Sequence, residues 1–412
     1  MSDKDNGNGE SEESKAEVFP RKLPFPVEPT NIPGIFAVAA PPDDFDPRTA
    51  SQRDLLRHGV LLRKPTAADD PALLATWDRF CTRHWRKMVR ANPRLEQRPG
   101  RKHPPRLRPR SDSAGLDTTQ DSWAGGYKIG GGTWVSIIGT WQVPTVSLPP
   151  SQVQEPGQPY ECPSGVEGVP PIPYDAGPWQ SASWIGLGGF YLDPSYPPID
   201  APMEVGTDIL QVGIIQEIAF DPANNINVPN YQAFYEWYTS TSSTQVLLSN
   251  DPTDSNAFLV NPGDTICATV MYDPTPVVSA SGTDQPMPAQ VSLYNANTGK
   301  YFSYVFINGP PEGSNWMGGS CEWIVEATSV NPPDDTTFPQ FTPPVNFNCT
   351  ISCAGVDPDP VFLGVDLMQT LDITSAYSLN SCLCTSQLTR TSVTNIPGNF
   401  TETVQIAWNV NE

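Results

Sequence analysis

The sequence predicts an all-β protein, a sandwich or a barrel, preceded by a separate N-terminal arm. From Trp123 onward, short apolar runs rich in β-branched and aromatic residues recur at regular spacing, separated by clusters of Gly, Pro, Asn and Asp. The chain of 412 residues contains 47 Pro and 31 Gly, which favours many turns over long helices. It has no apolar run of about 18 residues, so no transmembrane helix is expected.

The arm is predicted to be partly disordered and partly helical. Residues 1–34 are polar and acidic and then rich in Pro, a composition typical of chain without a packed core. A short helix is expected within residues 49–64. A stronger helix is expected over residues 71–91, where Asp70 supplies an N-cap and Pro71 takes the first helical position. Its apolar face recurs at steps of three and four and consists of Leu74, Trp77, Cys81, Trp85 and Met88.

Eight apolar runs after the arm predict strands. They are Trp134–Val143, Ser183–Leu187, Ile209–Phe220, Tyr231–Tyr238, Thr265–Tyr272, Gln290–Tyr294, Tyr301–Ile307 and Glu322–Val325. Turn residues separate them in the rhythm of a β protein. Residues 146–180 are rich in Pro and are predicted to form a surface loop, and no internal repeat is evident.

Charge divides the chain at about residue 110. Residues 1–110 hold 21 of the 24 Lys and Arg and 15 of the 45 Asp and Glu, so this part carries a formal charge of +6 and the remainder −27. We therefore expect a basic, propeptide-like arm over residues 1–115 and a body over residues 116–412. Protonation at low pH would relieve the self-repulsion of the body, which favours a protein that works in acid. A merely soluble acidic surface explains the charge equally well.

The body contains no histidine, because all three (His58, His84 and His103) lie in the arm. Its own residues therefore cannot build a Ser-His-Asp or Cys-His catalytic site or a His-ligated zinc site. Catalysis there must come from carboxylates, amides, hydroxyls or thiols, and no metal or organic cofactor is expected.

Eight cysteines occur in the chain, and seven of them lie in the body. Cys349, Cys353, Cys382 and Cys384 cluster near the C-terminus and could pair among themselves, although their connectivity is not set by sequence. The odd number in the body predicts at least one free, buried thiol.

Two predicted strands carry polar side chains in unusual places. In the run ILQVG, the period of two puts Gln211 and Gly213 on one face, where the glycine clears space beside a long amide. In the run CEWIVE, Glu322 and Glu326 share a face. We expect Gln211 and Glu326 to project from neighbouring strands into one cleft. The alternative is that both face solvent from half-exposed strands.

Six short motifs occur in the order found in one known family. They are Trp141–Pro144, Ser183–Leu187, Ile209–Gly213, Phe234–Tyr238, Pro262–Ile266 and Glu322–Glu326. Each motif alone is weak, but six in order are specific. The stretch from Ser122 to about Cys353 thereby resembles the glutamic endopeptidases, or eqolisins, the acid peptidases typified by scytalidoglutamic and aspergilloglutamic peptidases.

The resemblance implies a sandwich of two large antiparallel sheets, concanavalin- or lectin-like in outline, with a substrate cleft on the concave sheet. It also implies a catalytic Gln/Glu dyad, at the matching positions Gln211 and Glu326. The substrate-binding positions that it implies are Trp123, Phe234, Glu236 and Tyr238.

Several departures from the family pattern concern substrate preference rather than the chemistry. Gly188 stands where fungal members often carry Asp, and Gln232 and Phe234 replace an Asp and a Trp beside the cleft. Ala327 to Ser329 lack the acidic-aromatic run of well-known members.

The function implied is that of an acid-acting endopeptidase that hydrolyses peptide bonds by direct attack of water. Glu326 as a carboxylate would take the proton of the water and return it to the leaving nitrogen, while Gln211 would donate an N–H to the oxyanion. Polypeptides are the expected substrates, without membrane or nucleic-acid partners. The polar N-terminus shows no secretory signal, so location stays open, with an extracellular or acidic compartment favoured by the resemblance.

Two rival functions remain for the body. A glycoside hydrolase needs two carboxyl groups about 5–9.5 Å apart, and four residues of strand separate Glu322 from Glu326 by roughly 13 Å. Glu217 or Glu236 could still partner Glu326. The other rival is a sandwich that binds carbohydrate or peptide without catalysis.

The basic arm also admits more than one interpretation. Its Arg and Lys residues could bind nucleic acid, although the strongly acidic body offers an internal partner. We therefore expect the arm to dock on the body through charge and to inhibit it at neutral pH, with a disordered tail as the alternative.

Overall fold

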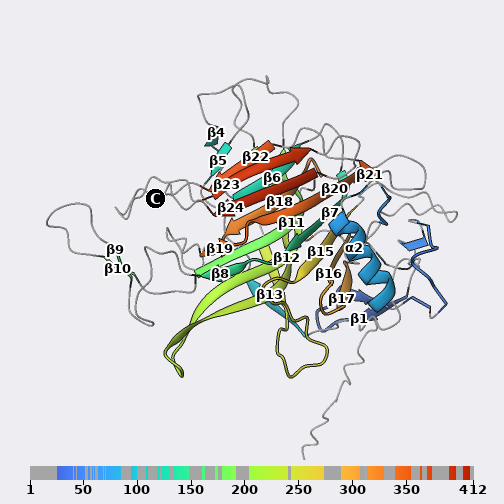
Figure 1. The fold of residues 1–412 in the computed structure, drawn as a ribbon, viewed down its shortest axis with the longest axis horizontal. Coiled ribbons are helices and arrows are strands. Elements are labelled where there is room, and N and C mark those ends of the chain that lie inside the picture. Colours follow the sequence, from blue (N-terminus) through green and yellow to red (C-terminus); the bar gives the residue numbers. More distant parts are fainter. Residues whose placement is uncertain are drawn as a thin grey trace, which may run out of the picture.

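The computed structural model describes most of residues 26–408. The longer stretches outside the described residues are 1–25, 85–93, 100–107, 110–117, 148–159, 163–171, 192–203, 273–288, 329–338, 354–361 and 374–388. The described chain is built almost entirely from strands in two large sheets, as Figure 1 shows. The predicted two-sheet antiparallel sandwich is thus confirmed.

The first sheet, sheet A, has ten strands that pair antiparallel. Their spatial order is β1 (Val27–Pro29), β2 (Ile35–Val38), β17 (Tyr301–Phe306), β16 (Ala289–Asn295), β15 (Thr265–Met271), β7 (Trp134–Gln142), β20 (Val345–Cys353), β24 (Glu402–Trp408) and β23 (Thr389–Asn395), with β21 (Phe362–Leu363) paired to β20. The sheet therefore combines arm strands β1 and β2 with strands from the rest of the chain.

The second sheet, sheet B, also has ten strands. Their order is β3 (Leu95–Pro99), β14 (Ser243–Leu248), β13 (Ile226–Tyr238), β12 (Glu204–Asp221), β11 (Trp179–Tyr191), β18 (Ser320–Ala327), β6 (Trp123–Ile129), β22 (Gln369–Ile373), β5 (Thr118–Gln120) and β4 (Arg108–Pro109). All neighbours pair antiparallel except β22 and β5, which are parallel. Two small two-stranded sheets pair β8 (Thr145–Ser147) with β19 (Gln340–Thr342) and β9 (Tyr160–Cys162) with β10 (Ile172–Tyr174).

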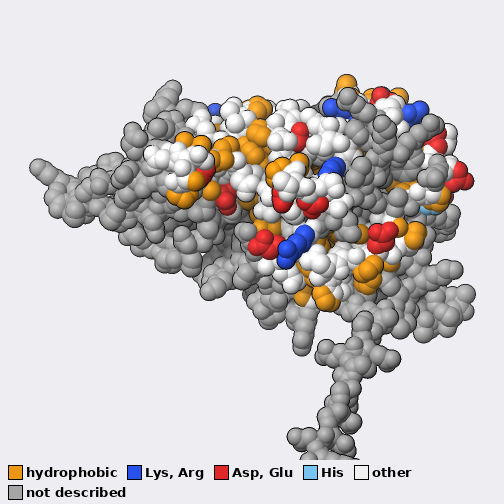
Figure 2. All heavy atoms as spheres, turned by 90° about the horizontal axis from the view of Figure 1, so that it is seen from below, with side chains coloured by type: hydrophobic (Ala, Val, Ile, Leu, Met, Phe, Trp, Pro, Cys, Tyr) orange, Lys and Arg blue, Asp and Glu red, His pale blue; other side chains and the backbone are white. Residues whose placement is uncertain are grey.

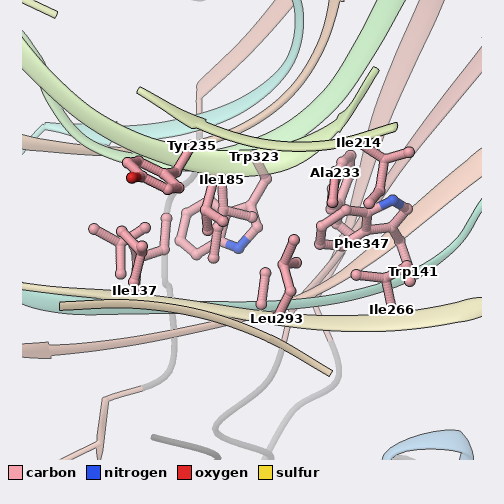
Figure 3. Close-up of a cluster of buried hydrophobic side chains, with 14 of the residues drawn as sticks. Ile137, Trp141, Ile185, Ile214, Ala233, Tyr235, Ile266, Leu293, Trp323 and Phe347 are labelled. Atoms are coloured by element: carbon pink, nitrogen blue, oxygen red, sulfur yellow. The ribbon is translucent and has the colours of Figure 1, made fainter. Parts of the chain in front are cut away.

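The core lies between the two sheets. Alternate residues of each strand point inward, so Trp323 and Tyr235 of sheet B meet Ile137 and Leu293 of sheet A, as Figure 3 shows. All four side chains are buried. Each of the eight predicted strands is present, because hydrophobic alternation directly reports which face of a strand is buried.

The predicted surface loop over residues 146–180 is only partly described. It contains the end of β8, the β9–β10 hairpin and the start of β11, and its other residues lie outside the described chain. Cys81, Cys267, Cys321 and Cys349 are free and buried, so the expected free body thiol is present. Cys349 thus takes no part in the pairing left open for the C-terminal cysteines.

The arm differs from the prediction at its beginning. Residues 1–34 were expected to be disordered; 1–25 lie outside the described residues, but β1 within this range pairs with β2 (Ile35–Val38), which extends sheet A from the edge of β17. The short run IFAV gains backbone hydrogen bonds from that edge, which composition alone does not reveal. Of the helix expected within 49–64, only isolated residues are described.

The second predicted helix begins at Pro71, as expected. It is α-helical as α2 (Pro71–Arg79) and continues as a π-helical turn, η1 (Phe80–His84). Asp70 and residues 85–91, including Trp85 and Met88, lie outside the described residues. None of the described helices is long and apolar enough to cross a membrane.

Helix η1 packs its apolar face on the side of sheet A that faces away from sheet B. Phe80 is fully buried and contacts Tyr294 edge-on at a centroid distance of 5.1 Å and Tyr301 at 6.5 Å. Leu55 of the arm and Ile138 of β7 belong to the same cluster. Apolar packing and strand pairing therefore join the described arm to the body. Charged side chains on the described surface are dispersed among apolar and neutral ones in Figure 2.

Replacement of Phe80 by Ala is expected to lower the free energy of unfolding by about 3–5 kcal/mol, the cost of emptying a buried aromatic site. Asp78→Ala, on the exposed side of α2, should change it by less than about 0.5 kcal/mol. Urea titrations of both variants measure the difference. Equal stability of the two variants would show that the arm does not hold to sheet A through this cluster.

Candidate active site

The outer face of sheet B, which points away from sheet A, carries an unusual set of side chains. Alternate residues of β12 and β18 fill the core through Leu210, Val212, Trp323 and Val325. The intervening residues point to the outer face, because side chains alternate along a strand. Every candidate residue from the sequence lies there: Trp123, Gln211, Phe234, Glu236, Tyr238 and Glu326.

The strand register fixes the position of each candidate on this face. Gln211 stands opposite Glu236 of β13 on one side and Gly186 of β11 on the other. Glu326 stands opposite Ala182 of β11 and Trp123 of β6. Strand β11 therefore separates β12 from β18, and the expectation that Gln211 and Glu326 come from neighbouring strands was wrong.

Trp184 of β11 lies on the diagonal between the two candidates. Its indole Nε1 donates a hydrogen bond of 2.7 Å to Oε2 of Glu326. Its other end lies over Gly186, where an added Cβ would be 2.9 Å from Trp184 Cζ3 and 3.4 Å from Gln211 Cβ. The indole thus forms a floor that reaches from Glu326 toward Gln211.

Two glycines make room for this indole. A Cβ on Gly213 would lie 2.5 Å from Cβ of Trp184, closer than any real contact, so only glycine fits opposite the tryptophan. The sequence pattern correctly indicated that Gly213 clears space, but the space holds Trp184. At Gly186 the space that a Cβ would need is taken by Trp184 Cζ3, Ile209 Cγ2 and Gln211 Cβ.

Glu236 orients the amide of Gln211. Gln211 Nε2 donates a hydrogen bond of 2.9 Å to Oε2 of Glu236, and no partner is present for Gln211 Oε1 among the described residues. Gln211 and Glu326 are each only 4 % exposed. The alternative of two solvent-facing residues is therefore wrong.

The register also gives the approximate span between the two candidates. On a flat sheet, two strand spacings and four residues correspond to roughly 16 Å between the Cα atoms of Gln211 and Glu326. Side chains stand away from a sheet, and the Gln211 amide is directed to Glu236 on β13, so the register sets the spacing of the two Cα atoms and not that of the polar atoms.

The other candidates surround these two residues. Trp123 packs edge-on against Trp184 at a centroid distance of 5.0 Å. Burial raises the pKa of Tyr238, and the nearby Glu236 carboxylate raises it further. Phe234 is buried beside Gly213. The face thus presents one amide and two carboxyl groups within an aromatic surround.

Sequence reasoning missed two residues of this face. Trp184 belongs to a recognised motif, but a Trp in an apolar strand usually indicates core, and only the register reveals its bond to Glu326. Glu322 was considered only as a partner of Glu326. It is fully buried, and neither of its carboxyl oxygens has a partner that satisfies hydrogen-bond geometry in the described residues.

Glu322 is held as a neutral acid. Burial raises the pKa of its carboxyl well above the usual value, opposed only in part by the Ser320 hydroxyl. Tyr127 stands opposite it in β6, Gly186 opposite it in β11, and Glu326 follows four residues later. Because the folded state keeps a proton that the unfolded chain loses above about pH 4.5, Glu322 makes the fold less stable as pH rises.

Glu322→Gln is therefore expected to stabilise the protein increasingly at higher pH. The difference in free energy of unfolding between the variant and the wild type should grow by up to about 1.4 kcal/mol per pH unit above pH 4.5, because glutamine does not titrate. Urea titrations at about pH 4, 5 and 6 measure it. A difference that stays constant over this range would mean that Glu322 titrates normally.

The described residues include no group of three or more His, Cys, Asp or Glu side chains able to hold a metal ion. The chemistry available on the outer face is that of carboxyl groups, an amide and aromatic side chains.

Comparison with known proteins gives two findings. Residues 121–396 match the model of the Peptidase A4 family. Two solved structures are also similar, both of scytalido-glutamic peptidase: one with a transition state analog inhibitor (17% identity, TM-score 0.41) and one with a peptide based transition state analog (19% identity, TM-score 0.37). Each similarity covers 70% of this chain and 98% of the solved chain. No curated protein matches.

Proposed function

The chain belongs to the Peptidase A4 family of glutamic-type endopeptidases, and on this premise we propose that it hydrolyses polypeptides in acid with Gln211 and Glu326 as its catalytic dyad. The observation that carries the proposal is that both residues belong to one face of sheet B, with the indole of Trp184, which is hydrogen-bonded to Glu326, lying on the diagonal between them. No covalent intermediate is required.

Glu326 acts on the water molecule in this mechanism. Its carboxylate accepts a proton from the attacking water and later delivers it to the nitrogen of the leaving amine. The hydrogen bond from Trp184 Nε1 holds Oε2 of Glu326 in place. A base of carboxylate strength keeps its charged form only above its own pKa, which suits operation at moderately low pH.

Gln211 acts on the carbonyl oxygen. Its amide has two N–H groups, one of which is directed to Glu236, and the second is available to the oxyanion that develops as water attacks. The amide cannot titrate, so it remains a donor at any pH. Glu236 contributes by holding the amide nitrogen on the side where it is needed.

We place Trp123 and Tyr238 as substrate contacts on the same face, because both are aromatic and adjacent to the dyad in the register. Phe234 was expected beside them, but it is fully buried in the cluster of side chains on this face.

The proposal is tested by digestion of an unfolded protein across about pH 2–7, with and without pepstatin, which inhibits peptidases with two catalytic Asp residues. Cleavage confined to acid and insensitive to pepstatin is expected. Hydrolysis of glycans instead of protein would support the alternative function, that of a glycoside hydrolase.

The register weakens one of the two glycosidase pairs. Glu236 lies three strands from β18 and level with Glu322, so its Cα is roughly 20 Å from that of Glu326 on a flat sheet, farther than the Cα of Gln211. Glu217 lies on the same face, about 12 Å from Glu326 by the same measure, and accepts a hydrogen bond of 2.7 Å from Gln180 Nε2, so the comparison of glycan with protein hydrolysis decides this pair.

For the arm, we propose docking by apolar packing in place of docking by charge. The cluster around Phe80 lies on sheet A, away from Gln211, and strand β2 adds backbone pairing to β17. High salt weakens such packing little, unlike surface ion pairs. The Phe80→Ala comparison above measures this contact directly.

A further inference from the structure

Strands β12 and β13 extend beyond their neighbours as a two-stranded hairpin. β11 pairs with β12 as far as Ile218, and β14 pairs with β13 no farther than Phe234. Beyond these points, among the strands that the structure describes, β12 and β13 pair with each other alone, to Asp221 and Ile226. Figure 1 shows the yellow-green end of β12 and β13 projecting from the sandwich at the lower left.

The tip of the hairpin is a fixed turn. The Asp221 carboxylate accepts hydrogen bonds of 2.9 Å from the backbone N–H of Ala223 and 2.7 Å from Asn224 Nδ2. These bonds, led by that of Asn224, lower the pKa of Asp221. Asn225 adopts the left-handed conformation that closes the turn, with a φ of 54°. The hairpin is therefore preformed rather than a loose loop.

Two apolar side chains are exposed on this hairpin. Ile226 is 48% exposed and Val228 is 37% exposed, and they are the large hydrophobic residues that stand out to solvent within the described chain. Both lie at even positions of β13, as do Phe234, Glu236 and Tyr238. By the period of two they belong to the outer face of sheet B, in line with Gln211.

We propose that Ile226 and Val228 form a remote binding surface for the polypeptide substrate. This inference rests on the proposed function, because the surface is continuous with the proposed dyad along the same two strands. An extended chain offers apolar side chains at alternate positions, which match the spacing of the two residues. The occupant follows from continuity, because the polypeptide that the dyad cleaves lies on the face that reaches these two residues.

The register predicts which substrates use this surface. Val228 pairs with Ala219, which is eight residues along β12 from Gln211, or roughly 26 Å at strand spacing. An extended substrate that lies along the strands must therefore carry about eight residues on one side of the cleaved bond to reach Val228. Short peptides would occupy the dyad without touching the hairpin.

The test uses the full chain with Ile226→Thr and Val228→Thr combined, since threonine keeps the branched shape and strand preference but adds a hydroxyl. The matched control is Asn227→Thr with Pro229→Thr, on the opposite face of the same strand. Two fluorogenic peptides share one cleavage sequence, one with about ten residues on each side of the bond and one with about four.

For the wild type we expect a lower KM on the long peptide than on the short one. The Ile226/Val228 variant should raise the KM for the long peptide by about 3- to 10-fold, as expected for loss of two small apolar contacts, and leave kcat and the short peptide unchanged. The control variant should behave as the wild type.

An unchanged KM on the long peptide would overturn the proposal. A wild-type dimer in sedimentation equilibrium that the variant converts to monomer would overturn it as well, because the surface would then bind a second copy. If the proposed peptidase function itself is wrong, the result is distinct: the wild type, the Ile226/Val228 variant and the control variant all fail to cleave either peptide.

Discussion

Replacement of Glu326 by Gln is expected to reduce kcat by about 10⁴-fold, the upper end of the range for a general base, because one carboxyl serves both as base and as acid. Glutamine keeps the size of the side chain and an oxygen to accept the hydrogen bond from Trp184 Nε1. The fold should therefore persist, and near-normal thermal unfolding of the variant checks this.

Glu217→Gln is the matched control for this loss. This variant also replaces a carboxylate with an amide. Glu217 lies on β12, as Gln211 does, but its carboxylate is hydrogen-bonded to Gln180 rather than to a residue of the dyad. Its peptidase activity should stay within about twofold of the wild type. Peptidase activity that survives in Glu326→Gln would show that another group activates the water.

Gln211→Ala is expected to lower kcat by about 10²–10³-fold, the cost of removing one oxyanion donor. Because the amide stabilises the transition state more than the bound substrate, KM should change little. Steady-state kinetics on the short fluorogenic peptide separate the two constants.

Gln245→Ala serves as the control for the amide. Gln245 is half-buried in β14 and stands opposite Glu236, two strands from Gln211. Its removal should leave kcat within a fewfold of the wild type. If Gln211→Ala lost no more than Gln245→Ala, the oxyanion would be stabilised elsewhere.

The sandwich could be predicted from sequence because short apolar runs rich in β-branched and aromatic residues are separated by turn residues. The runs that became β7 and β15 are of this kind, and nearly every residue in them is buried. Strands β1 and β2 could not be predicted in the same way. They are short and half-exposed, and they exist because the edge of β17 offers backbone partners, a condition set by tertiary structure.

The candidate site was predictable in part. The ordered motifs select Gln211 and Glu326, and the period of two predicts which face each occupies. The distance between the two residues depends on β11, which lies between β12 and β18. That strand order results from pairing between segments far apart in the chain, so the sequence pattern does not reveal it. For the same reason the role of Trp184 as a link between the dyad residues emerges only from the register.

Glu322 shows a further limit of pattern reasoning. The sequence places it on the same face as Glu326, which suggests a pair of similar carboxyl groups. Burial separates them, because Glu322 is enclosed without a well-placed partner and stays neutral while Glu326 is bonded to Trp184. Burial depends on all the elements that cover a position.

The most direct test of the dyad is a crystal structure of the full chain with a peptide whose cleaved carbonyl is replaced by a tetrahedral carbon bearing hydroxyl groups. We predict that one oxygen lies about 2.7–3.1 Å from Gln211 Nε2 and that another lies within hydrogen-bond distance of the Glu326 carboxylate, above the indole of Trp184. A tetrahedral centre bound away from either side chain would contradict the proposed mechanism.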